Sequence, residues 1–237
     1  MLGKRRALCL VPILALLWTA CGPIHTPLRP TTEDLKAVKR VGVVMPDEGR
    51  FLVILETGKD NRAAMAGAAF GVLGALLAGG ISEAHSSARD RETTERLKPH
   101  LDGWSARATF VSAFEAALRD AGQPVEVRLL DQDQAPADRK QYDAIATIRL
   151  TAWGLKVVLA GAHDALAGFA HVQVDMARTA DGTTIWDEQN VVLGQLRQTI
   201  GQYERDVEMF RDEVAEAVKS AGYQTATILL YPRGKAK

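Results

Sequence analysis

Both cysteines of this 237-residue chain, Cys9 and Cys21, lie within its first 21 residues. The rest of the chain therefore has no disulfide framework, no cysteine-ligated zinc site and no cysteine nucleophile. A fold of this length must then be held together by a packed apolar core. The composition allows one, because 47% of the residues are hydrophobic and 24% are charged, and these values exclude a wholly disordered chain.

The first 20 residues have the order of a secretory signal. A basic cluster at residues 4–6 precedes an apolar run from Ala7 to Ala20, which is too short for a comfortable membrane span. The run ends in small residues, directly before Cys21 and Gly22. This order resembles a bacterial lipoprotein signal, and the resemblance implies that Cys21 is acylated and begins the mature chain. An ordinary secretory signal and an uncleaved anchor are the alternatives.

Acylation of Cys21 would make membrane lipid a partner of this protein. Three acyl chains exceed the two signals that stable anchoring needs. By resemblance to lipoproteins sorted in Gram-negative cells, Gly22 implies the outer membrane, with the domain facing the periplasm. Residues 21–35 contain three prolines and are predicted to form a tether. Loss of the signal changes the formal net charge from zero to about −3, and neither value favours nucleic-acid binding.

The remaining chain is predicted to form one domain over residues 36–232, followed by a basic tail at 233–237. Strands are predicted over 38–45 and 51–56, joined as a hairpin, and over 124–130, 143–159, 170–176, 183–192 and 225–231. Helices are predicted over 105–121 and 196–221, ended by Gly122 and Gly222. Gly154 predicts a bulge or bend, and residues 179–182 a hairpin turn. The order predicts an α+β two-layer sandwich, with a mixed sheet and helices on one face.

Residues 63–81 form an apolar, Gly/Ala-rich segment of 19 residues without a charge. Small residues recur at every fourth position and would form one smooth ridge on a helix, at Ala63, Gly67, Gly71, Ala75 and Gly79. Two interpretations remain open. The helix either packs on the domain, or it inserts into a membrane and self-associates, which would imply a homo-oligomer. Alanine and glycine make up 12 of the 19 residues, so the apolar transfer energy is weak, which slightly favours packing.

Four stretches of the sequence carry a resemblance to known envelope proteins. They are VKRVGVVM at 38–45, FVSAFEAALRDAG at 110–122, YDAIATIRLTAWGLKV at 142–157 and VDMARTADGTTIWDEQ at 174–189. Their order resembles the periplasmic domain of envelope lipoproteins of the CsgG, LpoB and TolB N-terminal type. The resemblance spans about residues 36–60 and 104–231, and it implies the fold rather than any specific site residue.

The sequence contains no nucleotide-binding, nucleophile-elbow or zincin motif. Its five histidines lack metal-ligand spacing, and His171 is predicted to be exposed on the polar face of a strand. Acidic residues between 131 and 143 lack the glycine and closing glutamate of a calcium loop. We therefore predict that the protein is not an enzyme and has no catalytic residues, metal site or cofactor.

These observations predict a lipid-anchored periplasmic accessory or scaffold protein. It would act in envelope assembly, secretion or transport by binding an unidentified envelope protein with its sheet edge or loops. The main alternative is an oligomeric membrane-inserting protein that uses the segment 63–81. A third class is an unrecognised enzyme or small-ligand carrier.

Overall fold

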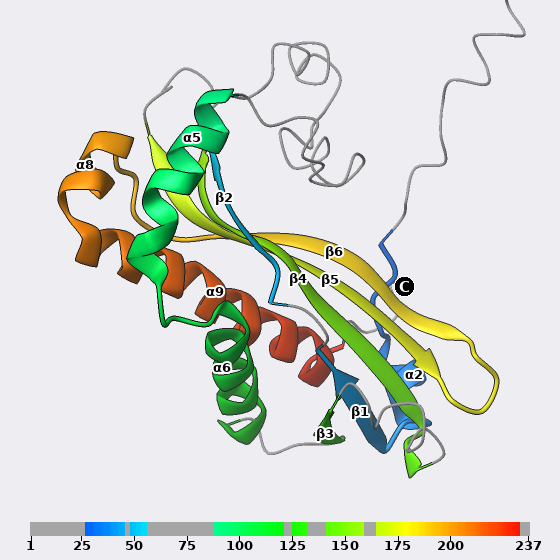
Figure 1. The fold of residues 1–237 in the computed structure, drawn as a ribbon. Helices are drawn as coiled ribbons and strands as arrows, with labels where there is room; N and C mark the ends of the chain where they lie inside the picture. Colours follow the sequence, from blue (N-terminus) through cyan, green and yellow to red (C-terminus); the bar gives the residue numbers. More distant parts are fainter. Residues whose placement is uncertain are drawn as a thin grey trace, which may run out of the picture.

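The computed structural model describes residues 27–45, 48–55, 88–120, 125–131, 141–158 and 165–232. The elements, shown in Figure 1, are α2 (Thr32–Lys36), β1 (Arg40–Val44), β2 (Arg50–Ile54), α5 (Ala88–Leu97), the 3-10 helix η2 (Lys98–Leu101), α6 (Ala106–Asp120), β3 (Glu126–Leu130), β4 (Ala144–Val157), β5 (Leu166–Arg178), β6 (Thr184–Leu193), α8 (Ile200–Arg205) and α9 (Val207–Leu230). The predicted α+β class with a mixed sheet is confirmed. The predicted signal, the helix at 63–81 and the basic tail lie outside the described residues.

The six described strands form one mixed sheet in the order β3-β1-β4-β5-β6, with β2 also beside β4. The predicted hairpin of the first two strands is wrong, because β1 and β2 each pair parallel with a different half of β4. Both strands therefore run in the same direction along β4 rather than antiparallel to each other. Gly49 makes this possible at φ +73°, where an added Cβ would lie 2.2 Å from the Leu150 carbonyl oxygen.

Strands β4, β5 and β6 form an antiparallel meander, as their alternating sequences predict. The predicted turn joins β5 to β6, where the Gly182 N–H donates to the Arg178 carbonyl at 3.0 Å. The irregularity predicted for β4 lies at Thr151, which the pairing with β5 skips between Leu150 and Ala152. Gly154 instead lies against β2, where an added Cβ would lie 2.0 Å from the Leu52 carbonyl oxygen.

The predicted end of the last helix at Gly222 and the strand after it are both wrong. Helix α9 runs unbroken from Val207 to Leu230. Gly222 lies inside it because α6 crosses there, and an added Cβ would lie 2.4 Å from the Phe110 carbonyl oxygen. Three of the residues that follow are β-branched, at Thr225, Thr227 and Ile228. Leu229 and Leu230 are nevertheless buried in the core as part of the helix, and this burial outweighs the strand propensity of the segment.

Helices α6 and α9 lie over one face of the sheet and enclose the main core (Figure 1). The predicted apolar face of α6 is confirmed, with Phe110 and Phe114 fully buried. Helix α9 packs directly on β5, where an added Cβ at Gly168 would lie 2.5 Å from the Glu213 carbonyl oxygen. The Glu213 carboxylate also accepts the Gly168 N–H at 2.8 Å and the Leu196 N–H at 3.2 Å. These bonds fix α9 to both β5 and the segment after β6.

The second half of the predicted tether belongs to the folded domain. Leu28 pairs with Asp187 of β6 through two backbone hydrogen bonds of 2.8 Å, and Arg29 forms an ion pair with Glu188. Helix α2 follows, with a capping box between Thr31 and Asp34. The chain between Cys21 and Leu28 can therefore reach at most about 25 Å when fully extended.

Within the part of the chain that the structure describes, side chains of α5 rather than another strand cover the outer edge of β2. The Thr94 hydroxyl accepts the Val53 N–H, and the Asp90 carboxylate accepts the Leu55 N–H, both at 2.9 Å. One turn of helix separates the two acceptors, so each meets an alternate residue of the strand. The covered N–H groups of β2 are therefore not available to a partner strand, and binding by another sheet edge stays a prediction.

Replacing the Thr94 hydroxyl tests this edge. Thr94→Val keeps the volume but leaves the buried Val53 N–H without an acceptor, so we expect a loss of about 1–3 kcal/mol in the free energy of unfolding. Urea denaturation measures the loss, and amide hydrogen exchange at Val53 should accelerate relative to that at Val43 of β1. Equal exchange and stability in wild type and variant would contradict the bond.

Candidate functional site

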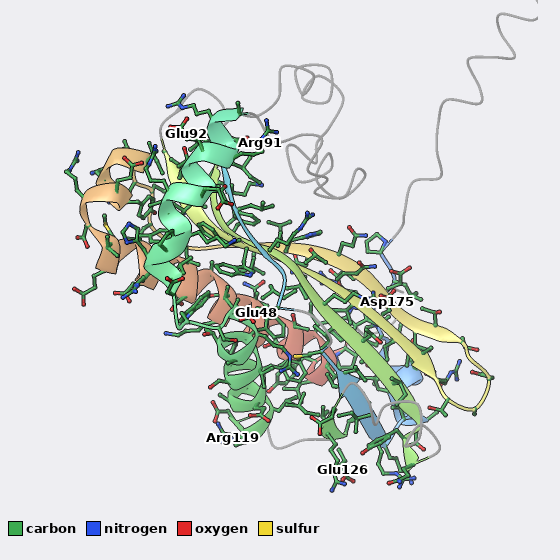
Figure 2. The ribbon with its side chains drawn as sticks, viewed as in Figure 1. Glu48, Arg91, Glu92, Arg119, Glu126 and Asp175 are labelled. Carbon is green, nitrogen blue, oxygen red and sulfur yellow. The ribbon has the colours of Figure 1, made fainter. Side chains whose placement is uncertain are left out.

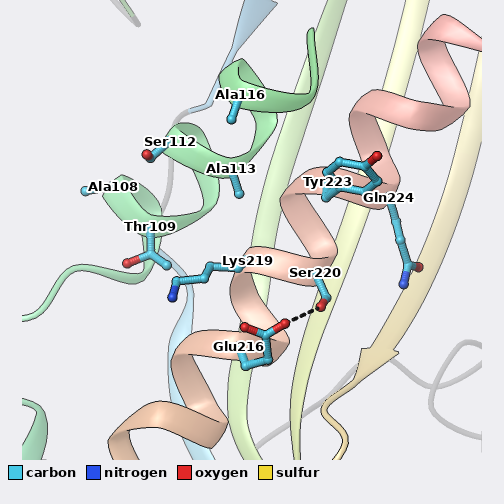
Figure 3. A pocket seen from close by; sticks show the side chains of 10 residues that line it. All are labelled: Ala108, Thr109, Ser112, Ala113, Ala116, Glu216, Lys219, Ser220, Tyr223 and Gln224. Carbon is cyan, nitrogen blue, oxygen red and sulfur yellow. Dashed lines mark hydrogen bonds between the residues drawn. The ribbon is translucent and has the colours of Figure 1, made fainter. Parts of the chain in front are cut away.

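A groove runs between α6 and α9 on the side away from the sheet core (Figure 3). Its volume is about 780 Å³, and α6 contributes only small side chains to it, at Ala108, Thr109, Ser112, Ala113 and Ala116. The helix that carries them begins at a capping residue, because the Ser105 Oγ accepts the Ala108 N–H at 3.0 Å. The close contact of Gly222 with Phe110 and Ala113 holds the two helices together beside the groove.

Helix α9 supplies the larger and more polar side of the groove. Glu216, Lys219 and Gln224 line it, and the Ser220 hydroxyl donates to the Glu216 carboxylate at 3.3 Å (Figure 3). The ring of Tyr223 is 56% exposed, whereas Tyr203 is fully buried in the core. A groove with a smooth floor and one exposed aromatic ring is suited to a docked helix and lacks the enclosure of a small-molecule site.

A second cluster of polar groups lies on the sheet face opposite α9. Lys156 of β4 and His171 of β5 are each only 4% exposed. Burial lowers the pKa of Lys156 to about 8. The pKa of His171 is lowered as well, first by burial and then by the charge of Lys156. The Thr151 Oγ1 lies 2.6 Å from the His171 Nδ1, and no described residue bonds to the buried Nε2.

The burial of His171 corrects the prediction that it is exposed. Alternation along β5 does place His171 on the face opposite the core helices. At this end of the strand, however, that face is also buried, because Ala167 and Phe169 beside His171 are almost completely inaccessible to solvent. Lys156 was missed altogether by sequence reasoning. The available signal was a single lysine inside the apolar end of a long strand, in the stretch Leu155-Lys156-Val157.

The described residues show no cluster of three or more histidine, cysteine, aspartate or glutamate side chains that could hold a metal ion. His100 contributes only its backbone carbonyl, to the Arg211 guanidinium, and Asp143 accepts the backbone N–H groups of Lys39 and Arg40, which lowers its pKa. The prediction that the protein is not an enzyme stays a prediction.

Several predicted site residues lie outside the described part of the chain. These are the acylated Cys21 and the ridge of Ala63, Gly67, Gly71, Ala75 and Gly79. Among the helices that the structure describes, none combines the length and apolar character that crossing a membrane requires. The membrane-inserting alternative concerns residues 63–81 and stays a prediction.

No protein-family model and no curated protein matches this chain. Among solved structures, the PelC dodecamer from Paraburkholderia phytofirmans is 12% identical, with a TM-score of 0.35, over 81% of this chain and 88% of that one. The lipoprotein GNA1162 from Neisseria meningitidis is 13% identical, with a TM-score of 0.21, over 72% of this chain and 96% of that one. At TM-scores this low we draw no conclusion about fold or function from the likeness. The resemblance to the CsgG, LpoB and TolB type stays a prediction.

Proposed function

We propose that this protein is a lipid-anchored accessory or scaffold protein of the bacterial envelope that binds a partner protein without catalysis. Cys21 would carry the lipid in the outer membrane, and the domain would face the periplasm. The basic–apolar–small–cysteine order of the N-terminus supports the anchor. The short reach from Cys21 to Leu28 would keep the β6 side of the domain near the bilayer surface.

The observation that carries the binding function is the groove between α6 and α9. Small side chains on α6 allow the backbone of a docked helix to approach closely, as ridges-into-grooves packing requires. Tyr223 at the side of the groove provides an aromatic anchor of the kind that dominates protein interfaces. The partner is therefore expected to present a helix, and Glu216 and Lys219 can pair with charges that flank its apolar face.

Photo-crosslinking in living cells tests both parts of the proposal. A benzophenone amino acid at Ser112, an exposed groove residue, should trap a discrete partner, whereas the same probe at the exposed hairpin residue Ala180 should not. Tyr223→Ala, which removes a mostly exposed ring, should reduce the Ser112 adduct at least several-fold without changing protein levels. In the same cells, an alkyne analogue of palmitate should label wild type but not Cys21→Ala.

Each readout can fail separately. Identical adducts at Ser112 and Ala180, or a Ser112 adduct that survives Tyr223→Ala, would contradict binding in the groove. Wild-type protein without the palmitate label would contradict the lipid anchor and leave the groove result standing.

A further inference from the structure

Strand β6 lies at one end of the sheet, beside β5, on which Asp175 is labelled in Figure 2. Among the described residues its outer edge is paired at a single point, where Leu28 and Asp187 exchange two backbone hydrogen bonds of 2.8 Å. In an antiparallel ladder such hydrogen-bonded pairs recur at every second residue. The backbone N–H and C=O groups of Gln189 and Val191 therefore point to the same outer side as those of Asp187.

This outer side of β6 is open beyond Asp187. No described residue forms a hydrogen bond with the outward backbone groups of Gln189 or Val191. Their side chains, and that of Leu193 after them, are only half-buried. A strand edge with several unpaired groups in a row readily accepts another strand.

The chain before Leu28 is in register to continue along this edge. Because Leu28 and Asp187 pair antiparallel, each step back along the N-terminal segment corresponds to one step forward along β6. Every second residue of the segment would then face β6. The opposed pairs would be Thr26 with Gln189, Ile24 with Val191, and Gly22 with Leu193.

The prolines of this segment fall at the positions where a paired strand tolerates them. Pro23 and Pro27 alternate with the residues that would face β6, so the sides on which they lack an N–H would point to solvent. Shifted by one residue, either proline would remove a hydrogen bond to β6. On the outer side the same prolines would oppose the addition of a further strand.

We propose that residues 22–26, which lie outside the described part of the chain, dock on the outer edge of β6 as a further strand of the sheet. Leu28 is already fixed to β6, so docking extends an existing pairing and needs no new loop to be closed. Each hydrogen-bonded pair would satisfy an outward N–H and C=O of β6. Ile24 would also cover the half-buried side chain of Val191.

Docking would fix the place where the lipid leaves the domain, a consequence that rests on the proposed acylation of Cys21. In the same register Cys21 would lie opposite Gly194, shortly before Leu196, which is 39% exposed. An undocked segment would instead leave the lipid anywhere within about 25 Å of Leu28. The strand itself needs no acyl chain, so an unacylated protein can test it.

Disulfide formation tests the register. The protein is the full chain in detergent micelles, with Cys9→Ser and Cys21→Ser so that the introduced cysteines are the only ones. His25→Cys and Asn190→Cys would form a non-hydrogen-bonded pair with Cα atoms about 4.5 Å apart, within the range that disulfides span. The matched control combines Ile24→Cys with Asn190→Cys, whose thiols would lie on opposite faces. In glutathione buffer we expect the equilibrium constant for the disulfide to be at least tenfold larger in the first pair.

Amide hydrogen exchange tests the docked strand without introduced cysteines. In the parent protein the Val191 amide should exchange at least tenfold more slowly than an unpaired amide, because the docked strand would accept its hydrogen. Ile24→Pro should remove this protection, since it deletes the N–H that would donate to the Val191 carbonyl. His25→Pro is the matched control, because the N–H that it deletes would face solvent, and it should leave the protection unchanged.

Three outcomes would overturn the docked strand. One is an equal disulfide constant for the two cysteine pairs, and another is a Val191 amide that exchanges as if unpaired in the parent protein. The third is protection that grows with protein concentration, or a disulfide between two chains, because a second copy would then occupy the edge. All of these measurements use unacylated protein, so a failure of the lipid anchor is distinguishable from a failure of the strand.

Discussion

Gly154→Ala should destabilise the protein by about 4 kcal/mol, a large share of the 5–15 kcal/mol that holds a typical domain together. Gly154 has φ +141°, and an added Cβ would lie 2.0 Å from the Leu52 carbonyl oxygen. The obstacle is backbone of the paired strand β2 rather than the end of a flexible side chain, so it cannot move aside without breaking the pairing. Backbone strain and overpacking each contribute about 1–3 kcal/mol.

Gly182→Ala separates these two contributions. Gly182 also has a positive φ, +70°, but an added Cβ there meets nothing within 4 Å. This variant should lose only about 1–2 kcal/mol, the cost of the backbone conformation alone. Urea denaturation followed by circular dichroism measures both variants. Equal losses in Gly154→Ala and Gly182→Ala would show that β2 does not pass over Gly154 as the structure has it.

Lys156→Met should have the opposite sign and stabilise the protein by up to about 3 kcal/mol at pH 7. The pKa of Lys156 falls from 10.5 to about 8 in the folded state, and each unit corresponds to about 1.4 kcal/mol. Below pH 8 the lysine is charged in both folded and unfolded chains, so the full penalty of burying the charge is present. As pH rises from 8 to 10.5 the folded state releases its proton first, and the penalty disappears.

The advantage of Lys156→Met over wild type should therefore shrink steadily between pH 8 and pH 10.5. Urea denaturation of both proteins at pH 7.5, 9 and 10.5 measures this difference, from which titrations elsewhere in the chain cancel. Lys98→Met removes an exposed lysine and should show no such trend. A variant less stable than wild type at pH 7.5 would mean that the ammonium has a favourable partner in the folded protein.

The sequence predicted best those elements whose periodicity matches their burial. The meander β4–β6 and the apolar face of α6 follow directly from alternation and from the spacing of Phe110 and Phe114. The errors occur where a contact between distant segments decides the structure. Gly222 resembles a helix end in sequence, but the close crossing of α6 keeps it inside α9. The strands β1 and β2 look like a hairpin because they are neighbours in the sequence, but each pairs with β4 instead, which the local sequence does not reveal.

The candidate sites were harder to predict than the fold for the same reason. The α6–α9 groove depends on how two helices cross, and its residues, such as Ser112 and Tyr223, have no unusual spacing. Lys156 and His171 are 15 positions apart and come to lie on the same sheet face only through the register of two strands, which the skipped Thr151 shifts by one residue. That shift places His171 opposite Ala152, and no local pattern in the sequence specifies it.

Covering the edge of β2 matters more for a protein anchored to a membrane surface than for one free in solution, because anchored copies meet more often. If Cys21 holds every copy in one leaflet, neighbouring copies diffuse in two dimensions and meet in similar orientations at high effective concentration. Unpaired strand edges would then join copy to copy into extended sheets. Asp90 and Thr94 satisfy the Val53 and Leu55 N–H groups, and Leu28 covers β6 at Asp187. The same segment that leads to the membrane thus covers β6 at Asp187 and hinders pairing between copies at that point.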